Sequence, residues 1–150
     1  MIVDRTNQDV QEALQIRQEK VQKGEQLTSS EIEILERGMI TINTLNRIEN
    51  KQIELVHIIN ELGYYCPEIS SKEWTYDDIF NLSDLERLIE NSEILRNAFL
   101  EYSTTPPKPS PLYHYKQINA LEQILLDLET MQSDIISNYR ECGTIECGEE

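Results

Sequence analysis

Three stretches of the chain carry apolar residues at alternating steps of three and four, and this heptad spacing constrains the fold more than any other feature. The first stretch runs from about Asn43 to Leu62, the second repeats its steps 40 residues later, and the third repeats them 73 residues later. The pattern predicts three long helices that each bury one stripe of side chains. These seam residues are Leu45, Ile48, Gln52, Leu55 and Ile59, then Leu85, Leu88, Ser92, Leu95 and Phe99, then Ile118, Leu121, Leu125 and Leu128.

Gln52 and Ser92 occupy the same place in the first two seams, and their polarity leaves two arrangements open. Loops of roughly 15 to 20 residues can return each helix beside its neighbour, which favours an antiparallel three-helix core within one chain. Alternatively, part of a stripe pairs with the same helix of another copy, where a buried polar residue would set register and oligomer state. The two arrangements can coexist at different ends.

Two shorter helices are expected before the first seam. Thr6 and Thr28 each stand three residues before an acidic residue, the spacing of a capping box at a helix start. Gly24 and Gly38 are placed to end these helices. In the same way, Asn43 and Ser83 are the expected N-caps of the first two long helices.

We therefore expect an all-α fold: an elongated helical bundle of about three long helices, with two shorter N-terminal helices and a short extended C-terminal tail. The chain divides into residues 1–40, the bundle 41–136 and the tail 137–150. Its 150 residues suit a single core. Within the bundle, residues 63–80 form an aromatic loop and residues 103–112 a proline-rich spacer.

The aromatic loop holds Trp74, Tyr76, Asp77 and Phe80. We favour the interpretation that Trp74 and Phe80 plug the end of the bundle, and the alternative is that this loop is an interface anchor. The spacer carries four of the five prolines, which cannot be helical and predict a stiff, extended, solvent-exposed connection. Binding of the spacer to an aromatic groove of a partner is less favoured.

The net charge and the cysteine content limit which classes of partner and which cellular compartment we expect. The chain has 13 Lys and Arg against 28 Asp and Glu, so its net charge of −15 would repel nucleic acid and anionic membranes. No basic region followed by an apolar run opens the sequence, which predicts a protein made and kept in a cytoplasm. Three cysteines without framework spacing predict reduced thiols.

Catalytic machinery is not evident in the sequence. There is no glycine-rich phosphate loop or nucleophile elbow, and His57 and His114 lack partners at metal-ligand spacing. We therefore expect no catalytic residue, cofactor, metal or small-molecule substrate. The best enzymatic alternative places magnesium on Glu86, Glu90 and Glu93, as in all-helical nucleotide pyrophosphohydrolases, although such residues are more often a solvated face.

The tail repeats Glu-Cys-Gly at an interval of five, and two thiols are at most half a zinc site. A segment that adds to a partner's sheet edge, or a disordered tail, is the favoured interpretation. Its candidate contact residues are Tyr139, Arg140, Cys142, Ile145 and Cys147, in addition to Trp74, Tyr76 and Asp77.

The order of several motifs resembles small structural proteins of tailed phages, prophages and phage tail-like particles of Gram-positive bacteria. The matching segments are 4–10, 27–39, 43–49, 74–78, 83–87 and 95–99. The tail is similar as well, with an aromatic-arginine pair before Gly143 and Gly148, while Cys142 and Cys147 depart from the pattern. The resemblance covers nearly the whole chain and carries over no catalytic residue.

The resemblance implies a non-enzymatic component of a virion or phage tail-like particle, assembled in the bacterial cytoplasm. Its expected place is the distal tail or baseplate, as an adaptor to receptor-binding fibres. The expected partners are other tail, baseplate or fibre proteins and further copies in three- or six-fold symmetry. A host coiled-coil scaffolding or regulatory protein is the alternative from a different class.

Overall fold

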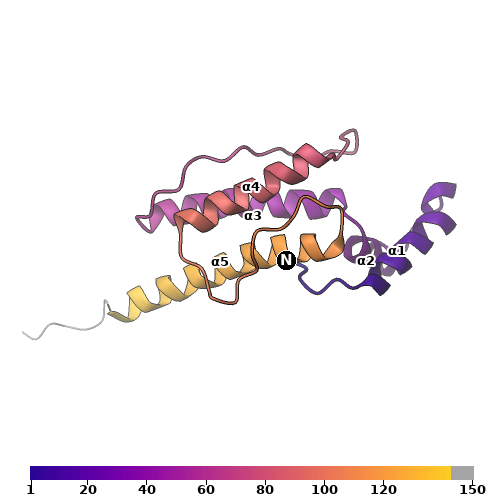
Figure 1. Ribbon diagram of the computed structural model, residues 1–150. Helices are drawn as coiled ribbons and strands as arrows, with labels where there is room; N and C mark the ends of the chain where they lie inside the picture. Colours follow the sequence, from indigo (N-terminus) through magenta and orange to yellow (C-terminus); the bar gives the residue numbers. More distant parts are fainter. Residues whose placement is uncertain (143–150) are drawn as a thin grey trace, which may run out of the picture.

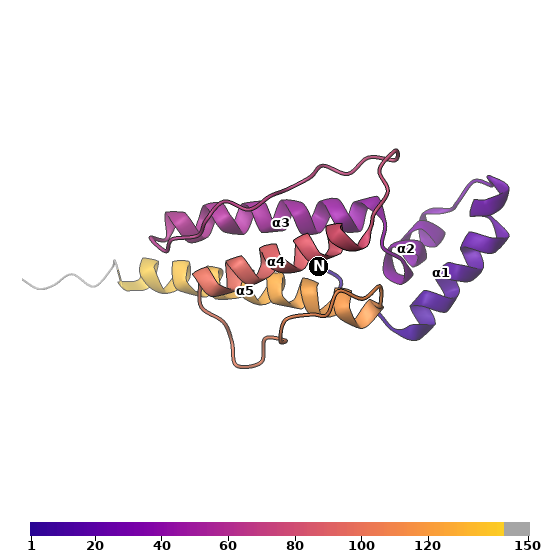
Figure 2. The same ribbon diagram turned by 45° about the horizontal axis from the view of Figure 1, so that its top comes forward.

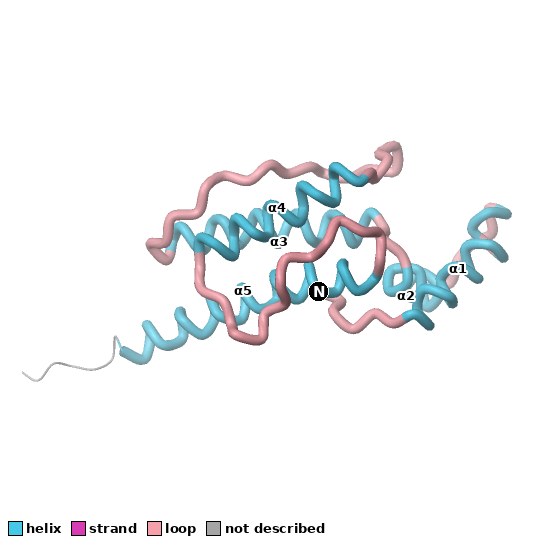
Figure 3. The backbone as a smooth tube through the Cα atoms, viewed as in Figure 1, coloured by secondary structure: helices cyan, strands magenta, loops and turns pink. Residues whose placement is uncertain are grey.

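The computed structural model describes residues 1–142, and within them the secondary structure is entirely helical (Figure 1, Figure 3). The expected all-α class is therefore confirmed. The elements in chain order are α1 (Asn7–Glu19), the short 3-10 helix η1 (Val21–Lys23), α2 (Ser29–Gly38), α3 (Ile42–Glu61), α4 (Leu82–Ala98) and α5 (Tyr115–Cys142). No helix of the described range is long and apolar enough to span a membrane.

Helices α3, α4 and α5 pack on one another around a single aliphatic core, whereas α1 and α2 pack mainly on each other at one end of these three helices (Figure 1, Figure 2). Every seam residue named from the sequence is buried. Ile89 and Ile124 widen the buried stripes of α4 and α5. The stripes therefore meet within one chain, which is the arrangement that the loop lengths favoured.

Capping residues in the sequence predict that a helix begins nearby, but they do not fix its first residue. Capping boxes form at Thr6 and Thr28, as expected. The N-caps of α3 and α4, however, are Thr41 and Asn81, whose side chains accept from backbone N–H groups three residues ahead. The predicted caps Asn43 and Ser83 were wrong, because each lies inside a helix whose N-cap is two residues earlier.

Two predicted boundaries also need correction. The first helix does not reach Gly24, because α1 ends at Glu19 and η1 follows, with Gly24 adopting φ +70° after it. At the other end, α5 continues through Cys142, so residues 137–142 are helical rather than extended. No proline or glycine interrupts α5 before its last residue, so no helix-breaking residue stops the helix at residue 136.

The proline-rich spacer is attached to the bundle along its length. The backbone of Pro106 accepts a hydrogen bond from Arg96 of α4, Thr105 donates to Asp127 of α5 at 2.8 Å, and Pro109 is buried. Most residues of the spacer are exposed, as expected, while these contacts hold it against α4 and α5. Proline fixes the extended backbone of this segment, but its apolar ring is also a good packing surface.

Candidate partner-contact site

Trp74, for which the sequence favoured a buried position over the alternative of an interface anchor, is buried. It is 3% exposed, and its indole N–H donates to Glu49 of α3 at 3.1 Å. Phe80 packs edge-on against its ring, with centroids 5.6 Å apart. Asn46 of α3 bonds both the N–H and the carbonyl of Trp74. In this chain Trp74 cannot be a surface anchor, because its ring is buried and its N–H already has a partner in α3. These contacts fasten the aromatic loop to α3.

The buried carboxylate of Glu49 connects this loop to α4 as well. Glu49 is 2% exposed and receives two hydrogen bonds from the guanidinium of Arg87. This pairing raises the pKa of Arg87. The carbonyl of Ser70 accepts from Arg87 at 2.9 Å and from Asn91 at 2.8 Å. Buried charges are tolerated when they are paired and hydrogen-bonded in this way.

The segment between these attachments presents Tyr76 to solvent. Tyr76 is 95% exposed and Asp77 is exposed, at the tip of a turn closed by a backbone bond from Asp78 to Thr75. Asp78 accepts from the N–H and hydroxyl of Thr75, both at 2.8 Å, and pairs with Lys72. The Lys72 ammonium is the main cause that lowers the pKa of Asp78 to about 2, and the Thr75 hydrogen bonds add to it. The result is a braced turn with an exposed aromatic side chain.

We call residues 75–79 the Tyr76 turn. Ile79, at its end, is 83% exposed. An aromatic ring, an aliphatic side chain and a carboxylate thus stand together on a backbone that its neighbours hold in place. Tyr76 and Asp77, named as contact candidates from the sequence, are both exposed, and their contact with a partner stays a prediction.

Gln52, for which a role between copies was one alternative, is bonded within the chain. Its amide N–H groups reach the Leu88 carbonyl at 2.7 Å and the Ser92 hydroxyl at 2.9 Å. Its amide oxygen accepts from Asn91 at 3.2 Å. A single slip of α4 past α3 would break these bonds in a buried setting, so Gln52 and Ser92 fix the register of α3 against α4.

A second buried network was not anticipated from the sequence. Glu122 of α5 is 0% exposed and pairs with Arg5, and it also pairs with Arg47 of α3 at 2.8 Å. The backbone N–H of Ile2 donates to Glu122 at 3.1 Å, and Asn119 bonds the Arg5 carbonyl at 3.0 Å. The N-terminal segment is thereby fastened to α5. Pairs more than a hundred residues apart leave no periodic signal in a single sequence.

The C-terminal candidates lie at or beyond the limit of the described residues. Tyr139, Arg140 and Cys142 belong to the last turns of α5, where the backbone is helical. Ile145 and Cys147 lie outside the described residues. The remaining thiol, Cys66, is buried, and burial raises its pKa, so it lacks the thiolate character of a reactive cysteine.

The acidic residues of the enzymatic alternative do not converge on a metal position. Glu90 pairs with Lys108, and Glu93 pairs with Arg96 at 3.2 Å. Glu86 is exposed on α4. Among the side chains that the structure describes, no three or more His, Cys, Asp or Glu residues form a cluster that could hold a metal ion.

Comparisons with protein-family models, with curated proteins and with solved structures gave no match for this chain.

Proposed function

We propose that this protein is a non-enzymatic structural component of a phage or phage tail-like particle, an adaptor at the distal tail or baseplate that connects to receptor-binding fibres. The observation that carries the proposal from the structure is the braced Tyr76 turn, with Tyr76 95% exposed beside the buried Trp74. The assignment to a phage particle is supported by the sequence motifs, whose order along the chain resembles that of phage structural proteins.

A braced turn suits recurrent protein contact for an energetic reason. Ordering a loop and its side chains on binding costs free energy, and a turn that is already held by hydrogen bonds avoids much of that cost. Tyrosine offers a large, amphipathic contact area with few rotatable bonds and is enriched among interface residues whose truncation weakens binding most. The Tyr76 turn therefore has the chemistry of a contact point.

In the proposed particle, the elongated three-helix bundle is the rigid body, and the residues after α5 form the second connection. Copies arranged with three- or six-fold symmetry would present several Tyr76 turns together, so that weak single contacts add by multivalency. The negative charge of −15 suits contacts with other proteins better than with nucleic acid.

The test is mass spectrometry of purified particles from an induced producing strain, with the wild-type chain, a Tyr76→Ala variant and a matched Tyr65→Ala variant. Tyr65 is also highly exposed, at 83%, but lies outside the Tyr76 turn. We expect wild type and Tyr65→Ala at a fixed ratio to tail proteins. We expect Tyr76→Ala at less than about a tenth of that ratio, because losing a hot-spot side chain costs roughly 2 kcal/mol or more.

Circular dichroism of the purified variants must show the same helical content, since both substituted side chains are exposed. A chain truncated after Cys142 should remain folded yet leave particles without fibres. If the wild-type chain is absent from particles, the phage proposal fails and the host scaffold takes its place. If Tyr76→Ala enters particles as well as wild type, the Tyr76 turn is not the contact.

A further inference from the structure

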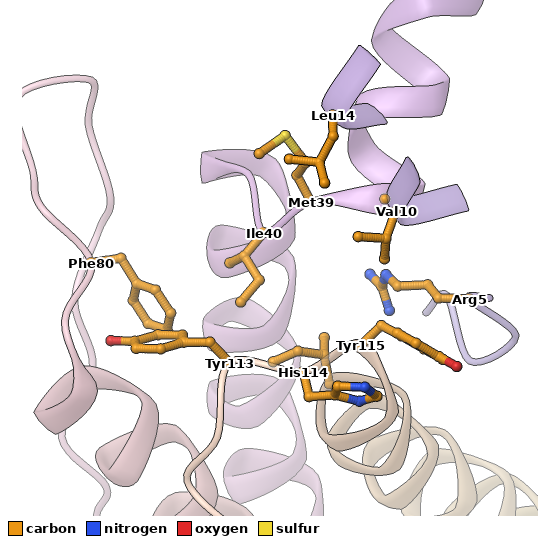
Figure 4. A pocket seen from close by; sticks show the side chains of 11 residues that line it. Arg5, Val10, Leu14, Met39, Ile40, Phe80, Tyr113, His114 and Tyr115 are labelled. Atoms are coloured by element: carbon orange, nitrogen blue, oxygen red, sulfur yellow. The ribbon is translucent and has the colours of Figure 1, made fainter. Parts of the chain in front are cut away.

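A cavity of about 280 Å³ lies where the α1–α2 pair meets the ends of the longer helices (Figure 4). It is lined by Val10 of α1, by Ile40 between α2 and α3, by Phe80 before α4, and by Tyr113 and Tyr115 at the start of α5, with Arg5 beside them. The lining therefore comes from five separate segments. Only the folded chain assembles it.

The guanidinium of Arg5 is the one strong cation of this lining, and one of its nitrogens is not satisfied. Arg5 is 5% exposed. Its Nη1 donates to Glu122 and to the Ile2 carbonyl. Its Nη2 is buried and has no hydrogen-bond partner among the described residues. In Figure 4 the guanidinium lies between Val10 and Tyr115, at the edge of the space that the labelled side chains surround. A buried donor left unpaired costs free energy that an added acceptor would recover.

The charges around this nitrogen favour an anion as that acceptor. Arg5 and the partly exposed Arg47 share the single carboxylate of Glu122. No Asp or Glu lines the cavity, although the chain has 28 acidic residues. Arg5 thus supplies a cationic group to a lining without carboxylates, and an anion placed beside it gains in a low dielectric.

The other walls of the cavity are apolar, so we expect the same ligand to carry an apolar group. Phe80 and Tyr113 meet edge to face with ring centroids 5.7 Å apart, and Val10, Ile40 and Met39 add aliphatic surface. Rings of this kind accept a further ring or a branched aliphatic group edge-on. A fully hydrated inorganic anion would leave these walls without a contact.

We propose that this cavity binds a small carboxylate with an aromatic or branched aliphatic body, its carboxylate oxygen accepting from Arg5 Nη2. The volume is near the lower end of ligand sites, which run from roughly 300 to 1,000 Å³, so one ring-sized group fits. The inference does not depend on the particle function. The ligand is either a free acid or the C-terminal residue of another chain, which present the same chemistry.

The experiment is an NMR titration of the ¹⁵N-labelled full chain with phenylacetate and with its neutral amide, phenylacetamide. We expect phenylacetate to shift the amide resonances of residues that line the cavity and to bind at least about tenfold more tightly than the amide. Tenfold corresponds to about 1.4 kcal/mol, within the range of a hydrogen bond to a charged group. Equal binding of acid and amide, or no shift with either, overturns the proposal.

Two peptides distinguish the sources. Gly-Gly-Phe with a free C-terminus carries the carboxylate and ring of a chain end, and its C-terminal amide is the control. Tighter binding of the free peptide than of phenylacetate supports a chain terminus. Binding of phenylacetate alone supports a free acid.

A pair of matched variants checks the location without disturbing the Arg5 network. Val10→Phe fills the cavity with a ring, whereas Val21→Phe makes the same change in η1, away from the lining. We expect Val10→Phe to weaken phenylacetate binding more than tenfold and Val21→Phe to leave it unchanged, each with wild-type Trp74 fluorescence. If the two variants behave alike, the ligand does not occupy this cavity.

Discussion

At the scale of single residues, two buried carboxylates each connect several segments that are far apart in the sequence. Glu49 joins α3 to α4 and to the aromatic loop, and Glu122 joins α5 to α3 and to the N-terminal segment. A buried ion pair adds little net stability over an apolar pair of the same shape, but removing one member leaves an uncompensated charge. These two residues should therefore tolerate substitution poorly.

Glu122→Gln tests this directly, because it keeps the shape and removes the charge between Arg5 and Arg47. We expect urea unfolding to show a loss of about 3 kcal/mol, in the range for breaking a buried pair. The matched control is Glu129→Gln on the same helix, where the partner Lys51 is shared with Glu54 and the Glu129 side chain is 42% exposed. That control should lose less than about 1 kcal/mol. Similar losses of unfolding free energy in the two variants would show that burial does not determine how much Glu122 contributes to stability.

Glu31 in the second capping box offers a prediction on pH. The Lys20 ammonium, 2.6 Å away, is the main cause that lowers the pKa of Glu31 from 4.5 to about 2, and Thr28 contributes further hydrogen bonds. Since the folded-state pKa is below the unfolded one, the contribution of Glu31 to stability is complete above about pH 4.5. It is lost as the pH falls through about 2.

The measurement is an NMR titration of the Glu31 side-chain carboxyl carbon. Lys20→Met should raise the pKa of Glu31 toward its ordinary value, and by more than Thr28→Ala does. A titration near pH 4.5 in the wild-type chain would contradict the geometry of the cap.

At the scale of elements, α1 and α2 meet unusually closely. A Cβ added at Gly38 would lie 2.1 Å from the Asp9 carbonyl oxygen and 2.4 Å from the Cβ of Ala13. Gly38 therefore serves close helix packing as well as the end of α2. The sequence suggested only the second role, because a helix-ending glycine and a packing glycine look the same in one sequence.

Gly38→Ala sets two effects against each other. Alanine gains up to about 1 kcal/mol in helix propensity, but overpacking against a backbone oxygen costs roughly 1 to 3 kcal/mol, so destabilisation should win. We expect faster amide hydrogen exchange in α1 and α2 with unchanged protection in α3, since the α1–α2 pair packs mainly on itself. Glu33→Ala, an exposed change in α2, is the control and should leave exchange unaltered. Unchanged exchange in Gly38→Ala would mean that α1 and α2 accommodate the added methyl group without loss of stability.

The same scale shows what the sequence could predict. Heptad spacing located all three seams, because burial on one face of a helix imposes a period that survives in any sequence. Cap positions failed by two residues, because Thr41 and Asn43, like Asn81 and Ser83, are all residue types that cap well. Burial of Glu122 could not be predicted, since it depends on segments that only the folded chain brings together. For Trp74 the sequence favoured a buried ring over a surface anchor, but it could not name Asn46 and Glu49 as the hydrogen-bond partners.

At the scale of the whole molecule, the three stripes are buried by one another, and Gln52 has its partners inside the chain. We therefore expect this core to form without a second copy. An oligomer in a particle would have to be built from exposed surfaces such as the Tyr76 turn, on top of a monomer that is already folded.

This separation of folding from assembly gives the last prediction. The urea midpoint of the purified chain should be the same at about 2 µM and about 200 µM, because only an obligate oligomer gains stability from concentration by mass action. Tyr76→Ala should leave that midpoint unchanged to within about 0.5 kcal/mol of unfolding free energy, since the side chain is exposed. A midpoint that rises with concentration would mean that copies share the helical core. The register set by Gln52 and Ser92 would then form between chains as well as within one.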